Sequence, residues 1–163
     1  MSLYYLNVTV HVLAALLWLG GMFFLAAVGA PALRELDAPL RAELFRRLGE
    51  QFRRVGWVAI GVLILTGIAN LQFRGMLSWD VLGSGAFWAT SYGHALAWKL
   101  GAVAAMLVAS AVHDFVLGPA ASRARPGTPE ALRLRRRAAL LARLNALAGV
   151  IVVIAAVRLA RGG

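Results

Sequence analysis

Four long apolar stretches constrain this chain more than any other feature. They cover residues 3–30, 52–73, 92–117 and 138–160. At a rise of about 1.5 Å per residue, each stretch is long enough to cross the roughly 30 Å hydrocarbon core of a bilayer as a helix. The pattern predicts an all-α integral membrane protein, a four-helix bundle that forms a single domain over residues 1–163.

The composition agrees with a membrane protein and narrows the class of partner. Of the 163 residues, 61% are hydrophobic, and the net charge is +10. The arginines gather in two connections beside apolar stretches, where orientation and anionic lipid headgroups explain them. We therefore expect a lipid bilayer, and no nucleic acid, as partner. The sequence contains no cysteine, so its side chains offer neither a thiolate metal ligand nor a cysteine nucleophile.

The two basic connections also predict an orientation. One runs from Pro31 to Gln51 and the other from Gly118 to Arg137, whereas the connection from Arg74 to Ser91 holds a single arginine. Cytoplasmic loops of membrane proteins carry an excess of Lys and Arg. The sequence thus predicts both termini outside, in a multi-pass protein of the inner (plasma) membrane.

Both basic connections contain signals for the start of a helix. In the first, Asp37 can cap a helix, and leucines recur every four residues from Leu40 to Leu48. This predicts a short amphipathic helix at the cytoplasmic membrane surface, between spans 1 and 2. In the second, Thr128 followed by Pro129 predicts that the last helix begins near Pro129 and projects below the membrane.

Ionisable side chains inside the apolar stretches are functional candidates, because they are costly to place in hydrocarbon. His11 and Lys99 are each expected about 8 Å outward of the centre of their stretch. Lys99, Met106 and His113 share one helix face, as His11 and Trp18 do on the first stretch. If these faces meet, His11 and Lys99 lie in one layer of the bundle.

Each of these residues also has a purely structural interpretation. His11 can hydrogen-bond a neighbouring helix, and Lys99 can extend to the outer interface. His113 and Asp114 can form an ordinary polar pair at the cytoplasmic interface, and His94 can lie among the headgroups. The residues alone leave both interpretations open at each position.

Three arginines near the ends of the stretches can bind carboxylates. Arg74 and Arg158 are expected at the outer ends of their helices, where they can hold the carboxylates of a bound cofactor. Arg143 is expected to form an ion pair with Asp114 at the cytoplasmic side.

A ridge of small residues marks the third stretch. Gly101, Ala105 and Ala109 repeat at four-residue spacing, which is typical of close helix packing in membranes. The same ridge leaves room for a flat cofactor, and the two interpretations are compatible.

Several motifs resemble a known family. The segment from His11 to Phe23 (HVLAALLWLGGMF) resembles the first helix of the CopD family of copper-resistance membrane proteins, with Ala30–Leu33 (APAL) following it. The segment Phe52–Asn70 is similar to that family's second element, and Trp98–Leu100, followed by His113, is similar to the third. The four-helix HemJ family of oxygen-independent protoporphyrinogen oxidases is similar in its first-span histidine and in a Lys-Leu pair on the third span.

These resemblances imply a cofactor and roles for several residues. HemJ-type proteins bind b-type haem and need the histidine that matches His11 and the lysine that matches Lys99, whereas the CopD resemblance implies copper. We predict haem b between the first and third spans, with His11 as axial ligand and either Lys99, His94 or an open face opposite it. The predicted cofactor-binding residues are His11, Lys99, His94, Trp18, Arg74 and Arg158, the predicted metal ligands are His11, His94 and His113, and the predicted catalytic residue is Lys99.

The predicted function is a haem b-binding membrane redox protein, which transfers electrons or oxidises a small or lipid-soluble substrate. The alternatives are a protoporphyrinogen oxidase of the HemJ type, a copper-handling membrane protein without haem, and an accessory subunit of a respiratory complex. A membrane or periplasmic redox partner and a homo-oligomer are both compatible with the sequence. Whether the protein is an enzyme is left open by its residues.

Overall fold

Long helices make up most of the chain. The computed structural model describes residues 2–125 and 128–161, and no β-strand occurs among them. Four helical segments are long and apolar enough to cross a membrane: Leu3–Arg34, Ala38–Phe73, Ser91–Arg123 and Pro129–Ala160. This confirms the prediction of an all-α, multi-pass membrane protein with four spans.

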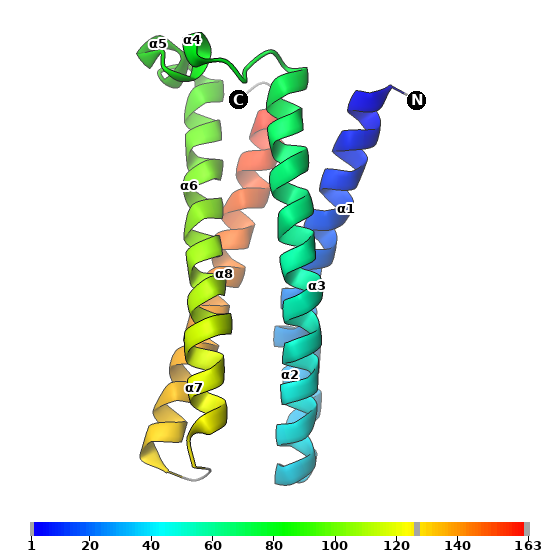
Figure 1. Cartoon of the computed structure of the whole chain (residues 1–163), viewed down its shortest axis with the longest axis vertical. Coiled ribbons are helices and arrows are strands. Elements are labelled where there is room, and N and C mark those ends of the chain that lie inside the picture. Colours follow the sequence, from blue (N-terminus) through cyan, green and yellow to red (C-terminus); the bar gives the residue numbers. More distant parts are fainter. Residues whose placement is uncertain (1, 126–127, 162–163) are drawn as a thin grey trace. The chain divides into compact units, whose positions relative to one another are not determined.

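Contacts between the helices divide the chain into two compact units, with the boundary between Ser84 and Gly85. Each unit is a hairpin of two long antiparallel helices (Figure 1). We call residues 2–84 hairpin 1 and residues 85–161 hairpin 2. In each hairpin, the connection between the long helices forms the turn end, and the opposite end is the open end. That the two units associate into a single domain stays a prediction.

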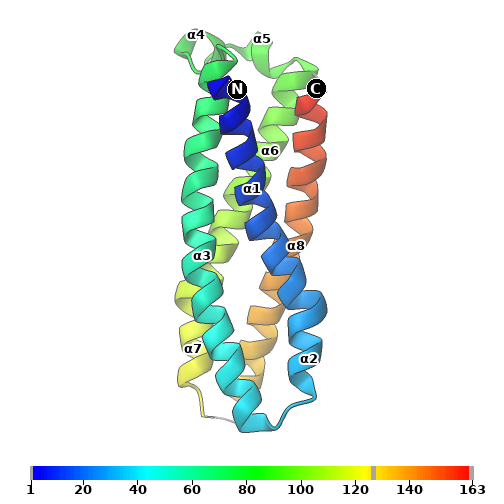
Figure 2. The ribbon, with the colours of Figure 1, turned by 90° about the vertical axis from the view of Figure 1, so that its right-hand side faces the viewer.

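Hairpin 1 packs α1 against α3 (Figure 2). Ser2 caps α1, because its hydroxyl accepts a hydrogen bond from the backbone N–H of Tyr5. The elements of this hairpin are α1 (Leu3–Phe24), the π-helix η1 (Leu25–Gly29), α2 (Ala30–Arg34), α3 (Ala38–Phe73) and α4 (Trp79–Leu82).

Hairpin 2 packs α6 against α8. Thr90 and Thr128 cap these two helices by accepting from the backbone N–H groups of Gly93 and Ala131. The last helix begins at Pro129, as predicted. The elements of this hairpin are α5 (Gly85–Trp88), α6 (Ser91–Ala111), the π-helix η2 (Val112–Leu117), α7 (Gly118–Arg123) and α8 (Pro129–Ala160).

The two hairpins repeat one pattern along the chain. In each, a π-helix ends just before a proline in the first turn of a short helix, Pro31 in α2 and Pro119 in α7. Proline lacks an N–H and crowds the carbonyl four residues before it, so the preceding turn must rearrange. His11 lies 20 residues before Pro31, and Lys99 lies 20 residues before Pro119. His11 and Lys99 therefore occupy equivalent positions in the two hairpins.

The segment expected to form a short amphipathic helix is the first part of α3. That helix runs unbroken from Ala38 to Phe73, over 36 residues, which is about 54 Å. Ion pairs at helical spacing support its first turns, because Arg46 binds both Glu43 and Glu50. The polar segment thus extends the second span and is not a separate helix on the membrane surface.

Candidate functional site

Three pairs of polar side chains connect α1 and α3 over the half of hairpin 1 nearest its open end. We call their six residues the polar ladder. The pairs are Tyr4 with Arg74, Asn7 with Asn70, and His11 with Thr66. Residue numbers rise along α1 as they fall along α3, as antiparallel packing requires. The ladder runs from the helix ends to His11, about 10 Å deeper along α1.

The hydrogen bond of His11 determines its tautomer. Nδ1 of His11 lies 2.7 Å from Oγ1 of Thr66, and that hydroxyl donates to the carbonyl oxygen of Val62 at 2.6 Å. A threonine hydroxyl has one proton, so Nδ1 of His11 carries the hydrogen of the pair. The lone pair of the neutral imidazole is then on Nε2. Metal-binding histidines usually have this arrangement, in which the other ring nitrogen donates to a protein acceptor.

Two glycines of α3 lie against the two large side chains of the predicted α1 face. A Cβ built on Gly67 would lie 3.6 Å from Cε1 of His11, and one built on Gly56 would lie 3.6 Å from Cδ1 of Trp18. Trp18 is 7% exposed. His11 and Trp18 therefore share a face, as predicted, and this face is turned toward α3.

Asn7 connects two rungs of the ladder. Its Nδ2 donates to the backbone carbonyl of Thr66 and to Oδ1 of Asn70, each at 3.0 Å. Both amide protons are thus used, and Oδ1 of Asn7 is the acceptor atom that this side chain offers. Asn7 lies one turn from His11 on the same helix, so the ladder offers an amide oxygen and an imidazole nitrogen on neighbouring turns.

The open end of the ladder is formed by Tyr4 and Arg74. Nη2 of Arg74 donates to the hydroxyl of Tyr4 at 3.3 Å, and the Tyr4 ring meets the edge of Phe73 with centroids 5.9 Å apart. Arg74 is exposed at the end of α3. A positive charge therefore stands where the ladder meets solvent or headgroups.

Hairpin 2 has a polar contact near the middle of its two long helices. Nδ2 of Asn145 donates to Oγ of Ser110 at 2.9 Å, and both residues are buried. In the adjoining η2, Nδ1 of His113 lies 3.0 Å from Oδ1 of Asp114, which is the polar pair considered for these two residues. Arg143 does not join them: it is exposed and forms no ion pair with a described residue, so the expected Arg143–Asp114 pair is wrong.

The face of α6 and η2 that carries Lys99, Met106 and His113 is buried at its centre. Met106 is 1% exposed, and Lys99 and His113, one on each side of it, are half-buried. Lys99 is therefore partly covered within the protein, whereas His94 is exposed.

A shallow apolar groove lies on hairpin 2, with a volume of about 470 Å³. The predicted small-residue ridge forms part of its floor, through Gly101 and Ala105. The lining residues are His94, Ala97, Trp98, Gly101, Ala102, Ala105, Ala148 and Ile151.

The predicted site residues are divided between the two hairpins. Hairpin 1 carries His11, Trp18 and Arg74, whereas hairpin 2 carries the others: Lys99, His94, His113 and Arg158. The shared site of His11 and Lys99 stays a prediction. Within the described part of the chain, no three His, Cys, Asp or Glu side chains gather into a metal cluster.

Sequence reasoning singled out Arg74 but did not find the other two α3 members of the ladder, Thr66 and Asn70. Thr66 and Asn70 are polar residues one turn apart in an apolar stretch, and this spacing was the available signal. On a membrane span, polar residues on one face usually meet a partner helix.

Comparisons with known proteins agree with the first resemblance. A family model described as copper resistance protein D (CopD) matches residues 46–159, over half of the chain. The match begins inside α3, so α1 and His11 precede it. An uncharacterized protein of Aquifex aeolicus (strain VF5) is 40% identical over 62 residues, an alignment covering 37% of this chain and 42% of that protein. No solved structure matches the chain. The chain is a multi-pass membrane protein and belongs to the copper resistance protein D family.

Proposed function

We propose that this protein handles copper within the membrane and that Nε2 of His11 is a copper ligand. Membership of the copper resistance protein D family supports copper as the cargo. The observation that carries the assignment is the hydrogen bond from Nδ1 of His11 to Oγ1 of Thr66, because it directs the lone pair of the ring to Nε2.

The donor atoms of the ladder favour copper(II). Imidazole nitrogen and amide oxygen, which His11 and Asn7 offer, are ligands suited to that ion, whereas copper(I) prefers thiolate and thioether sulfur. No sulfur atom belongs to the ladder. The polar atoms between Tyr4 and His11 also replace part of the water that an ion loses when it enters an apolar region.

A copper titration of the purified protein in detergent tests the proposal. We expect one copper(II) ion per chain, with nitrogen hyperfine structure in its electron paramagnetic resonance spectrum. His11→Ala removes both, whereas His94→Ala, which deletes an exposed imidazole of hairpin 2, keeps them. Loss of copper in His94→Ala and not in His11→Ala would move the ligand to hairpin 2 and contradict the proposal.

A second candidate is haem b on the same histidine, and one observation favours it. Arg74 places a guanidinium at the open end of the ladder, where it disfavours an approaching cation and suits the carboxylates of a haem. His11 would then hold the haem, which would supply one-electron redox chemistry. The catalytic role predicted for Lys99, and the cofactor contacts predicted for His94 and Arg158, belong to this candidate.

Two measurements separate the candidates. A Soret band in the absorption spectrum of the purified protein supports haem, and its absence from protein expressed with added haem precursor excludes haem b. Arg74→Gln lowers haem retention if the guanidinium holds carboxylates. The same substitution leaves copper affinity unchanged or raises it, because it removes a repelling positive charge.

A further inference from the structure

The turn ends of the two hairpins carry unequal charge. Residues 34–54 of hairpin 1 hold six arginines and four carboxylates, whereas residues 123–143 of hairpin 2 hold seven arginines and one carboxylate, Glu130. Because each group sits beside an apolar stretch, both are expected near the membrane surface. The difference lies in how the arginines are neutralised.

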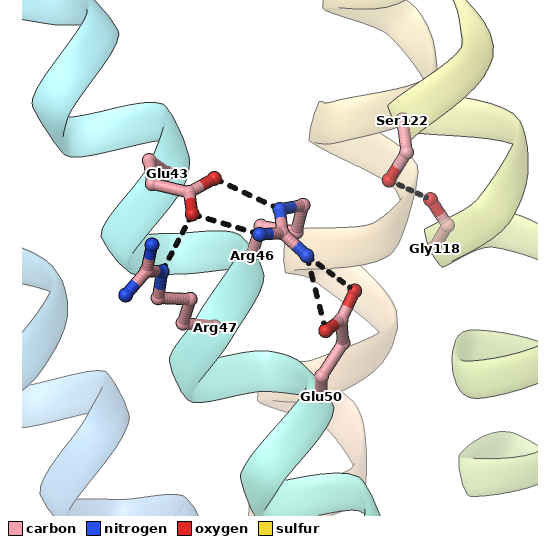
Figure 3. A network of polar contacts seen from close by, with 6 residues as sticks. All are labelled: Glu43, Arg46, Arg47, Glu50, Gly118 and Ser122. Atoms are coloured by element: carbon pink, nitrogen blue, oxygen red, sulfur yellow. Dashed lines mark hydrogen bonds and ion pairs between the residues drawn. The ribbon is translucent and has the colours of Figure 1, made fainter.

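In hairpin 1, arginines of α3 are bound by carboxylates of the same helix (Figure 3). Arg46 lies 2.7 Å from Oε1 of Glu43 and 3.0 Å from Oε1 of Glu50, and Arg47 binds Glu43 from the other side. Hydrogen bonds from Arg46 and then Arg47 lower the pKa of Glu43 to about 2. Arg46 and Arg47 are therefore already paired with carboxylates of their own helix.

In hairpin 2, the arginines at the start of α8 lack such partners. Arg133, Arg136 and Arg137 are exposed and form no ion pair among the residues that the structure describes. Their i, i+3 and i+4 spacing places them on one outward helix face. We call these three residues the arginine face.

The arginine face is held on a rigid support. Thr128 caps α8 by accepting from the N–H of Ala131, and Ala131 is 1% exposed. The start of α8 is thus anchored on one side while its arginines project on the other. Fixed guanidinium groups lose less conformational freedom on binding an anion than those of an unstructured loop.

We propose that the arginine face binds the phosphates of anionic lipids. The apolar stretch of α8 begins at Ala138, directly after Arg137. Arg133 lies only about 6 Å further from the hydrocarbon along the helix axis. The face therefore lies at the depth of lipid phosphates, and guanidinium groups bind phosphate through paired hydrogen bonds. Hairpin 1 binds such lipids less strongly because Glu43 and Glu50 occupy its arginines.

Lipid retention by the full chain tests this proposal. The protein is reconstituted in bilayers of phosphatidylcholine and phosphatidylglycerol, returned to detergent, and analysed for bound phosphatidylglycerol. The triple variant R133Q/R136Q/R137Q is expected to bind phosphatidylglycerol about a hundredfold more weakly. The matched variant R46Q/R47Q of hairpin 1 should change retention less than threefold, since its arginines already have partners.

Two further variants keep the outcome clear. E43Q/E50Q releases Arg46 and Arg47 and should increase retention of phosphatidylglycerol. R133K/R136K/R137K keeps the charge and should keep most of the lipid, which shows whether loss in the glutamine variant reflects charge or misfolding.

Raising the salt from 0.1 M to 1 M should weaken binding of phosphatidylglycerol, because it shortens the Debye length from about 10 Å to about 3 Å.

Two results would overturn the proposal. One is a folded R133Q/R136Q/R137Q protein that retains as much phosphatidylglycerol as the parent. The other is thermal stabilisation by inorganic phosphate in lipid-free detergent that equals stabilisation by phosphatidylglycerol, because the face would then be a site for soluble phosphate.

Discussion

Hairpins 1 and 2 share one outline but differ in the depth and the kind of the polar contacts described here. In hairpin 1 the polar ladder lies toward the open end, whereas in hairpin 2 the Ser110–Asn145 pair joins the long helices near their middle and the His113–Asp114 pair lies within η2. Hydrogen bonds between membrane helices contribute only about 0.6 kcal/mol on average. Packing must therefore hold the two long helices of each hairpin together. The placement of polar atoms distinguishes the chemistry of the two hairpins.

The equivalent positions of His11 and Lys99 make the comparison sharper. A neutral imidazole that donates from Nδ1 can coordinate a ligand through Nε2, whereas the equivalent position of hairpin 2 holds the longer, flexible side chain of a lysine. One repeated backbone thus presents an imidazole in hairpin 1 and a lysine side chain in hairpin 2.

The largest expected effect tests that difference directly. His11→Ala should weaken copper(II) binding by about a hundredfold or more, since loss of a first ligand exceeds the 10–100-fold effects of outer-shell partners. Lys99→Ala should change it less than threefold. Isothermal titration on both variants measures this, and equal losses would show that the two positions serve one site.

A smaller effect is expected from the hydrogen-bond partner of His11. Thr66→Val removes the acceptor for Nδ1 while keeping the side-chain shape, and should weaken copper binding by about 10–100-fold. Thr9→Val is the matched control, because the Thr9 hydroxyl donates to the carbonyl of Tyr5 on its own helix. An unchanged copper affinity in a folded Thr66→Val protein would show that copper binding does not depend on the hydrogen bond from Nδ1 of His11.

The polar contacts should affect stability modestly and about equally in the two hairpins. Asn7→Ala and Ser110→Ala each remove a contact between helices and should lower the free energy of unfolding by about 0.6–1.7 kcal/mol. Denaturation in mixed micelles measures both. A loss several times larger in only one hairpin would show that its polar contact, and not its packing, holds it together.

The smallest effect concerns pH and is confined to hairpin 1. The pKa of Glu43 lies at about 2 in the folded chain, below its ordinary 4.5, because of Arg46 and then Arg47. Its stabilising contribution is therefore present above pH 4.5 and is lost as the pH falls toward 2. Solvent screening keeps this contribution small, because the carboxylate is on the surface. Glu43→Gln should remove the pH dependence, measured as helix content between pH 5 and pH 2, and an identical profile in both proteins would contradict the assignment.

Local sequence patterns were sufficient to predict the four spans and the helix face that carries His11 and Trp18. Apolar runs longer than a bilayer predicted the four spans, and Thr128 before Pro129 predicted the start of α8, because capping depends on neighbouring residues. Helical periodicity placed His11 and Trp18 on one face. The same local rules did not predict that α3 continues through its polar segment, although the helical spacing of Glu43, Arg46 and Glu50 was an available local signal for a continuous helix.

The sequence by itself determined that an imidazole lies inside a membrane span, because composition and length require the span and the position of His11 follows. Only the tertiary structure decided what that imidazole can do. Thr66 is 55 residues away, and it reaches His11 because antiparallel docking of α1 on α3 sets the register between the helices. The Thr66 hydroxyl already donates to Val62, so His11 must donate from Nδ1 and present its lone pair at Nε2. No local pattern contains that choice, since it depends on two helices meeting at one turn.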